Sequence, residues 1–145
     1  MIRKLDHTEI PQAIALSLEI FTLCGTEDFN EEGLETFKSF IHNESLMNEL
    51  ILYGAFNSRE KLTGIIGTKN NGKHISLFFI RKEYHRKGIG KQLFNYAIQH
   101  SPAPEITVNS STYGVPFYQS LGFEIMGEVQ ECHGLKSIPM KRIAE

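Results

Sequence analysis

Two stretches near the start of the chain repeat their apolar residues at the period of an α-helix. Helical spacing is followed by Ile10, Ile14, Leu18 and Phe21, and again by Leu34, Phe37 and Ile41. This spacing predicts helices over residues 10–21 and 30–41, each with one face toward a core. Asn30 is a favourable N-cap for the second helix, and a short edge strand is predicted before the first, at residues 2–5.

The pattern then changes to the short apolar runs that are typical of β-strands. Strands are predicted at residues 50–56, 62–68 and 74–80, with polar connections between them. In the second connection, Asn71-Gly72 is a strong signal for a type I′ hairpin turn. This part of the chain is therefore predicted to be an antiparallel meander.

The last third of the chain alternates between helices and strands. Its predicted elements are a helix to about Gln99, a strand at 105–109, a short helix at 114–121, and final strands at 123–129 and 135–143. The first of these helices connects the strands at 74–80 and 105–109 as a crossover, so we expect these two strands to be parallel. The predicted order is β-α-α-β-β-β-α-β-α-β-β, an α/β (α+β mixed) fold. Its central sheet is mixed but mostly antiparallel, with six or seven strands and helices on both faces.

Composition narrows the class of protein. The 145 residues fit a single domain, 1–145, and 41% hydrophobic with 22% charged residues is usual for a globular protein. No run approaches the roughly 18 apolar residues of a membrane span, and the N-terminus lacks the apolar stretch of a signal peptide. We therefore expect a soluble, cytoplasmic protein without a membrane partner. Cys24 and Cys132 match no metal or redox spacing, so no bound metal is expected.

One segment gathers cations in a chain whose net charge is −2. After the apolar run at 75–80, the sequence YHRKGIGKQLF (84–94) sets two glycines among basic residues. Five Lys or Arg occur from Arg81 to Lys91, against the single acid Glu83. A strand, a glycine turn and a helix start in this order expose backbone N–H groups that bind an anion. The surrounding cations predict a guest with several phosphates. Elsewhere no basic surface interleaved with aromatic residues indicates nucleic acid.

Two known phosphate-binding motifs do not fit this segment. A P-loop needs glycine at position 85, which is His85, and Ser or Thr at position 92, which is Gln92. The dinucleotide motif G-x-G-x-x-G needs a third glycine at Leu93, and it also needs a parallel sheet from its first strand onward. A helix start with merely solvated lysines is the structural alternative.

The strand followed by HRKGIG and a helix, the strand that ends in Asn, and the later VPFYQSLGF together resemble the Gcn5-related N-acetyltransferase (GNAT) family. Residues 85–90 occupy the family's pattern Gln/Arg-x-x-Gly-x-Gly/Ala, with His85 where Gln or Arg is usual. The resemblance extends over nearly the whole chain. It implies a GNAT-like fold in which the strands at 74–80 and 105–109 splay apart to admit a cofactor arm.

The resemblance also implies the reaction, in which a primary amine of a small molecule or peptide attacks acetyl-CoA directly. The residues it assigns to acetyl-CoA are Phe79, Ile80, His85, Arg86, Lys87, Gly88, Ile89, Gly90, Lys91 and Asn109. A backbone N–H near Phe79 would polarise the thioester carbonyl. Tyr118 matches the tyrosine that protonates the leaving thiolate, and its alternative role is a packed aromatic residue. The alternative for Asn109 is an ordinary turn asparagine.

Several points stay open at this stage. Candidates for the base that takes the proton of the amine are Glu27, Asp28, His74 and His133. The acids of segment 25–32 either draw in a cationic amine or form a solvated loop. A catalytically silent module that binds coenzyme A or a protein partner is the alternative function, and a homodimer is compatible with either. The sequence does not choose among polyamines, aminoglycosides, amino acids and peptides as acceptors, nor between acetyl and other acyl groups.

Overall fold

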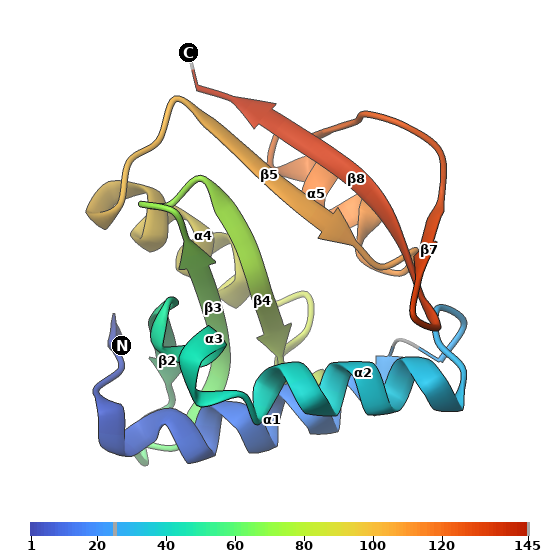
Figure 1. Ribbon diagram of the computed structural model, residues 1–145. Coiled ribbons are helices and arrows are strands. Elements are labelled where there is room, and N and C mark those ends of the chain that lie inside the picture. The colour runs from blue at the N-terminus through green and yellow to red at the C-terminus, as the bar shows by residue number, and fades with distance from the viewer. Residues whose placement is uncertain (25, 145) are drawn as a thin grey trace.

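The computed structural model describes residues 1–24 and 26–144, which build one sheet with helices on both of its faces (Figure 1). The strands are β1 (Ile2–Lys4), β2 (Ile51–Phe56), β3 (Leu62–Lys69), β4 (His74–Ile80), β5 (Glu105–Ser110), β6 (Glu124–Ile125), β7 (Gln130–Cys132) and β8 (Leu135–Ile143). The helices are α1 (Ile10–Cys24), α2 (Glu31–Ile41), α3 (Glu44–Asn48), α4 (Ile89–His100) and α5 (Val115–Ser120), with 3-10 turns η1 (His7–Glu9) and η2 (Lys82–Tyr84). The strand order is β1-β2-β3-β4-β5-β8-β6, and β7 also pairs with β8. The predicted fold class is thus confirmed.

Local signals in the sequence behave as expected at two points. The side chain of Asn30 accepts a hydrogen bond from the amide of Gly33 (2.9 Å), so Asn30 is the N-cap of α2. In the β3–β4 connection, Asn71 and Gly72 have φ values of 56° and 84°, and the amide of Lys73 donates to the carbonyl of Asn70 (3.2 Å). These are the features of a type I′ turn. Both predictions are confirmed.

The single strand predicted at 123–129 is wrong, because the chain forms β6 and β7 with an irregular stretch between them. The amide of Met126 donates to the carbonyl of Pro139 (2.8 Å), so the carbonyl of Pro139 points toward β6. In an antiparallel ladder the N–H of a residue points to the same side as its carbonyl, so an N–H at position 139 would also point toward β6. Proline has no such donor, and the ladder is interrupted there. The sheet consequently has eight strands. The short helix α3 was not predicted either.

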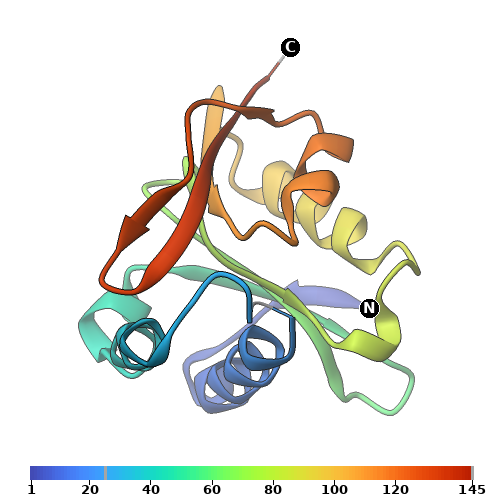
Figure 2. The same ribbon diagram turned by 90° about the vertical axis from the view of Figure 1, so that its right-hand side faces the viewer.

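Two hydrophobic cores lie on opposite faces of the sheet, which explains the apolar runs of the central strands. Ile65 and Ile66 of β3 are both fully buried, the first in the core under α1–α3 and the second in the core under α4 and α5. Because successive side chains of a strand point to opposite faces, a strand covered on both sides needs apolar residues throughout. Figure 2 shows α1 and α2 on one side of the sheet and α4 and α5 on the other.

The parallel pairing of β4 and β5 is confirmed, but it is short. Only His74 with Thr107 and Ile75 with Val108 are paired in register. Beyond this point the two strands diverge (Figure 1). A hydrogen bond between His74 Nδ1 and Thr107 Oγ1 (2.8 Å) joins the strands where they still pair, and burial followed by the nearby Lys69 charge lowers the pKa of His74. The divergence opens the sheet at its centre, as the family resemblance implied.

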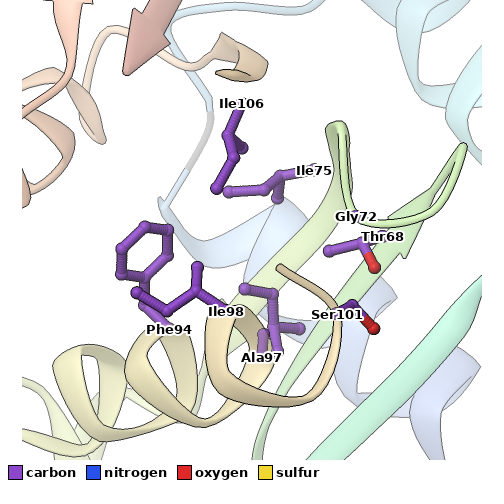
Figure 3. Close-up of a pocket in the computed structure, with 9 residues that line it drawn as sticks. Thr68, Gly72, Ile75, Phe94, Ala97, Ile98, Ser101 and Ile106 are labelled. Atoms are coloured by element: carbon purple, nitrogen blue, oxygen red, sulfur yellow. The ribbon is translucent and has the colours of Figure 1, made fainter. Parts of the chain in front are cut away.

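A small cavity of about 10 Å³ lies between α4 and the β3–β4 hairpin (Figure 3). Thr68 lines it, and the Oγ1 atom of Thr68 is buried without a hydrogen-bond partner among the described residues. A buried hydroxyl without a partner is destabilising, because it has lost its hydrogen bonds to water.

Within the described part of the chain, no helix combines the length and the apolar content needed to cross a membrane.

We expect Thr68→Val to raise the free energy of unfolding by about 1 kcal/mol, because a methyl group replaces the unpaired hydroxyl at nearly constant volume. Thr63→Val is the matched control. Thr63 is equally buried, but its hydroxyl donates to the carbonyl of Ala55 (3.1 Å), so this variant should lose stability. Urea unfolding of both variants measures the difference. Equal losses in the two would contradict the interpretation of Thr68.

Candidate active site

A cleft of about 1060 Å³ occupies the opening between β4 and β5. At one end, called the α4 end, it is lined by the segment from Tyr84 to the start of α4 and by α5 with the residues just before it. At the other end, called the α1–α2 end, it is lined by α1, α2 and the β7–β8 hairpin. The cleft therefore runs from one face of the sheet to the other, and the exposed edges of β4 and β5 lie between its two ends.

The N-terminus of α4 presents unpaired amides to the α4 end. The first intrahelical bond runs from the amide of Gln92 to the carbonyl of Gly88 (3.0 Å), and no side chain caps Gly88. The amides of Ile89, Gly90 and Lys91 therefore precede the first hydrogen-bonded turn, and all three residues line the cleft. Together with the positive end of the helix dipole, such amides bind an anion.

Glycine is favoured at positions 88 and 90 of this loop for two different physical reasons. Gly88 has φ +82° and ψ 1°, a left-handed conformation that favours glycine, and a Cβ there would meet no atom within 4 Å. Gly90 is required by packing instead. A Cβ on Gly90 would lie 2.8 Å from Cζ of Phe117, so glycine lets α4 approach α5 closely.

Only two of the five cations counted in the sequence line the cleft, namely Arg86 and Lys91. Arg81 pairs with Glu19 of α1 (2.9 Å) instead. The ammonium of Lys87 lies 5.5 Å from the ring centroid of Tyr84, outside the lining of the cleft. The structure thus does not bring Lys87 to the site for which it was predicted.

His85 lines the cleft and ties the end of β4 to the loop before α5. Its Nε2 lies 2.6 Å from the carbonyl oxygen of Ile80, which can only accept, so Nε2 carries the proton. Its Nδ1 then accepts from the hydroxyl of Tyr113 (3.4 Å). Where the family usually has Gln or Arg, this chain has a side chain that positions the two segments flanking the α4 end.

The free edge of β4 directs two backbone amides into the cleft. The amide of Arg81 donates to the carbonyl of Thr63 (2.8 Å), which sets the alternation of the β3–β4 ladder. By this alternation the amide of Phe79 faces β3, whereas the amides of Phe78 and Ile80 face the cleft. Phe79 itself contributes a side chain on the α1–α2 face. The role of an amide near Phe79 at a thioester stays a prediction, and the amides that face the opening are those of its two neighbours.

Tyr118 of α5 lines the cleft, and its ring meets that of Phe78 on β4 edge to face, with the centroids 6.0 Å apart. Its ring is buried, with edge contacts to the rings of Phe117 (5.6 Å) and Phe123 (5.4 Å). Burial raises the pKa of Tyr118 above its usual value, because the charged phenolate is poorly solvated there. A tyrosine hydroxyl is already protonated at neutral pH, and burial keeps it in this form, which is the form that can donate a proton. Asn109 lines the cleft from β5, on the opposite side of the opening.

Of the four candidate bases, Asp28 and His74 line the cleft, while Glu27 and His133 are exposed outside it. Asp28 is not free, because its two carboxylate oxygens accept from the amide (2.9 Å) and the hydroxyl (2.6 Å) of Thr112. This link joins the connection between α1 and α2 to the loop before α5. Within the acidic segment 26–32, only Asp28 reaches the cleft, and position 25 lies outside the described residues.

Aromatic residues cover much of the α1–α2 end, and sequence reasoning missed this feature. Phe21, Phe37, Phe40 and Phe79 all line it. Helical spacing assigned Phe21 and Phe37 to the core face of their helices, and the sequence carries no signal that separates a core face from a cleft wall. The free cysteines Cys24 and Cys132 also lie at this end. Among residues 1–24 and 26–144, no three His, Cys, Asp or Glu side chains cluster closely enough to hold a metal ion.

The tip of the β7–β8 hairpin closes one side of the α1–α2 end by docking on the start of α2. Three hydrogen bonds join the two segments, from Asn30 N to Gly134 O (3.3 Å), from Thr36 Oγ1 to His133 O (2.8 Å) and from Lys136 N to Asp28 O (2.7 Å). The backbones approach so closely at Gly33 and Gly134 that a Cβ on Gly33 would collide with the carbonyl oxygen of Gly134. Glycine at position 33 is therefore needed for this contact.

We expect Gly33→Ala to lower the free energy of unfolding by about 1–3 kcal/mol, because the hairpin must shift away from α2. Gly127→Ala is the control, since a Cβ there would meet only Cγ of Pro139 at 3.6 Å, an ordinary contact. Chemical denaturation of both variants makes the comparison. If alanine at position 33 were as well tolerated as at position 127, the close docking would be absent in solution.

Comparisons with known proteins now place the chain. A family model described as an acetyltransferase (GNAT) domain matches residues 25–144. The chain belongs to the GNAT family. The peptidyl-lysine N-acetyltransferase YjaB of Escherichia coli K12 is 29% identical over 146 residues, which cover 99% of this chain and 95% of that protein. The family assignment suggested by the glycine loop and the later VPFYQSLGF is thereby confirmed.

Solved GNAT structures have the same fold. A GCN5-related N-acetyltransferase from Rhodopseudomonas palustris superposes with a TM-score of 0.83 at 16% identity, covering 99% of this chain and 95% of that one. PaiA N-acetyltransferase from Thermoplasma acidophilum has a TM-score of 0.78 at 23% identity, with 99% and 98% coverage. At these identities the likeness establishes the fold of this GNAT protein alone.

Proposed function

We propose that this GNAT protein transfers an acetyl group from acetyl-CoA to a primary amine. The observation that carries the proposal is the arrangement of one cleft. The uncapped α4 N-terminus with Arg86 and Lys91 lies at one end, the free edge of β4 follows, and Tyr118 of α5 lies beside Phe78 of that strand. This sequence of features matches the order of diphosphate, amide-bearing arm and thioester in acetyl-CoA.

The α4 end fits the diphosphate of acetyl-CoA. The amides of Ile89, Gly90 and Lys91 would donate to the phosphate oxygens, and Arg86 and Lys91 would add charge-assisted contacts. The amide-bearing arm would then pair with β4 along the edge that carries the amides of Phe78 and Ile80, with Asn109 facing it from β5. PaiA and an aminoglycoside 6'-N-acetyltransferase (TM-score 0.64), both of this fold, were solved with coenzyme A, which supports the assignment.

In the proposed reaction the neutral nitrogen of the amine attacks the thioester carbonyl carbon while the carbon–sulfur bond breaks. An amide of β4 stabilises the negative charge that develops on the carbonyl oxygen. Tyr118 gives its proton to the departing sulfur. The proton lost by the amine then passes through solvent and reprotonates Tyr118. Most of the rate enhancement comes from holding the two reactants in attack geometry within the cleft.

The test combines binding with turnover. Titration calorimetry should detect acetyl-CoA binding, and release of free thiol in the presence of mixed primary amines should detect transfer. Binding without thiol release on any amine would instead favour a catalytically silent module that binds coenzyme A. Absence of binding would overturn the assignment of the α4 end.

A further inference from the structure

We propose that the acceptor is an amine attached to an aromatic or other apolar group and carrying no second positive charge. Polyamines and aminoglycosides are then poor acceptors. The inference rests on the proposed function and concerns the α1–α2 end of the same cleft, where the attacking amine must enter. The aromatic lining of that end and the charges along the cleft support it.

A chain of aromatic contacts leads from the connection between α1 and α2 to β4. The ring of Phe21 stacks on Phe29 with centroids 4.5 Å apart, and on Phe37 at 4.0 Å with the two planes nearly parallel. Phe37 in turn meets Phe79 edge to face at 5.9 Å. Phe79 belongs to the strand whose free edge would hold the thioester, so the aromatic chain ends beside the reacting carbonyl.

This wall is an apolar surface at a place where an acceptor must lose water. Phe21, Phe40 and Phe79 are each only half-buried, and all three line the cleft. Aromatic rings gain both apolar contact area and favourable ring geometry from a further aromatic group. A hydroxylated or multiply charged acceptor would lose hydration against these rings without finding hydrogen-bond partners on them.

The charges along the cleft point the same way. Among the described residues that line it, the cations Lys69, Arg86, Lys91 and Lys136 stand against Asp28 as the single acid. Both oxygens of Asp28 already accept from Thr112, so no free carboxylate awaits an ammonium group. Because the diphosphate would pair with Arg86 and Lys91, the cations left for the acceptor are Lys69 and Lys136, and a second positive charge on the acceptor would be repelled by them.

The acids outside the cleft do not change this balance. Glu27, Glu31 and Glu32 are exposed and absent from the lining of the cleft, although they are close in sequence to Asp28, which lines it. They can act on an approaching amine only across solvent, where salt screens charges beyond a distance of about 10 Å. The sequence-based hypothesis of an acidic segment that draws in a cationic amine therefore finds no counterpart at the point of attack.

The experiment compares kcat/KM for three amines at saturating acetyl-CoA, using thiol release with 2-phenylethylamine, spermidine and kanamycin. We expect 2-phenylethylamine to exceed both others by at least about tenfold. A preference for spermidine or kanamycin would overturn the inference and leave the proposed function standing. If no amine supported thiol release, the proposed function would be overturned, and the inference with it.

Two variants test the two arguments separately. Phe40→Ala should raise KM for 2-phenylethylamine by roughly tenfold and leave KM for acetyl-CoA unchanged, because it removes one ring from the wall.

Lys136→Glu should raise kcat/KM for spermidine, because it places a free carboxylate beside the α1–α2 end. Lys61→Glu is its control, since Lys61 is equally exposed and lies outside the cleft. Equal effects of the two charge reversals on spermidine would contradict the argument from charge.

Discussion

Gly88→Glu is expected to abolish acetyl-CoA binding, with a loss of affinity of more than roughly 100-fold. Gly88 is the N-cap of α4, and its left-handed backbone turns the amides of the next three residues toward the α4 end. A glutamate there brings a negative charge to the position of the diphosphate and opposes the contacts of Arg86 and Lys91. Calorimetric titration with acetyl-CoA measures the loss.

The matched control is Gly88→Gln, which has the same size and the same backbone strain but no charge. A Cβ at position 88 meets no atom within 4 Å, so both variants should fold, each losing about 1–2 kcal/mol of stability to the left-handed conformation. We expect the glutamine variant to retain measurable binding. Were Gln and Glu to weaken binding equally, the effect would come from backbone strain, and the electrostatic account of the α4 end would fail.

Tyr118→Phe is expected to lower kcat by roughly 100-fold or more while leaving the affinity for acetyl-CoA nearly unchanged. The ring packs against Phe117, Phe123 and Phe78, and phenylalanine keeps these contacts. Only the hydroxyl is lost, and burial holds that hydroxyl protonated well above neutral pH by raising its pKa. Thiol release under saturating conditions gives kcat, and calorimetry gives the affinity.

Tyr96→Phe is the control for this prediction. Tyr96 lies on α4 outside the cleft, where its ring stacks on His100 at 3.9 Å, so loss of its hydroxyl should leave kcat unchanged. Equal turnover in wild type and Tyr118→Phe would remove Tyr118 from the role of acid. The leaving thiolate would then take its proton from water.

Some features of the candidate site depend only on neighbouring residues in the sequence, whereas others depend on contacts made in the folded protein. The unpaired amides at the start of α4 were predictable, because an apolar strand, a glycine turn and a helix start are adjacent in sequence. The side-chain assignments of the same loop were less so. Lys87 and Arg86 are neighbours, yet Arg86 lines the cleft and Lys87 turns to the ring of Tyr84. Which way a flexible basic side chain points depends on the packing around it, not on its position in a motif.

The family resemblance could suggest that β4 and β5 splay, but not what lines the far side of the opening. The α1–α2 end is built from α1, α2 and the β7–β8 hairpin, which are distant in the chain and meet only in the folded protein. Their joint surface is aromatic, whereas the most conspicuous signal in that part of the sequence is the acidic segment 25–32. The acids are mostly directed to solvent, and the aromatic rings are directed inward.

The order of the longer elements, the type I′ turn, the N-cap at Asn30 and the amides at the start of α4 were determined by the sequence alone, because each depends on residues within a few positions of one another. Tertiary structure decided the rest. The carboxylate of Asp28 meets Thr112 across 84 positions, and the β7–β8 hairpin meets α2 at Gly33 and Gly134. Contacts of this kind follow from how the layers pack, since only folding brings such residues within hydrogen-bonding distance. The same packing determines which charges and rings line the α1–α2 end of the cleft.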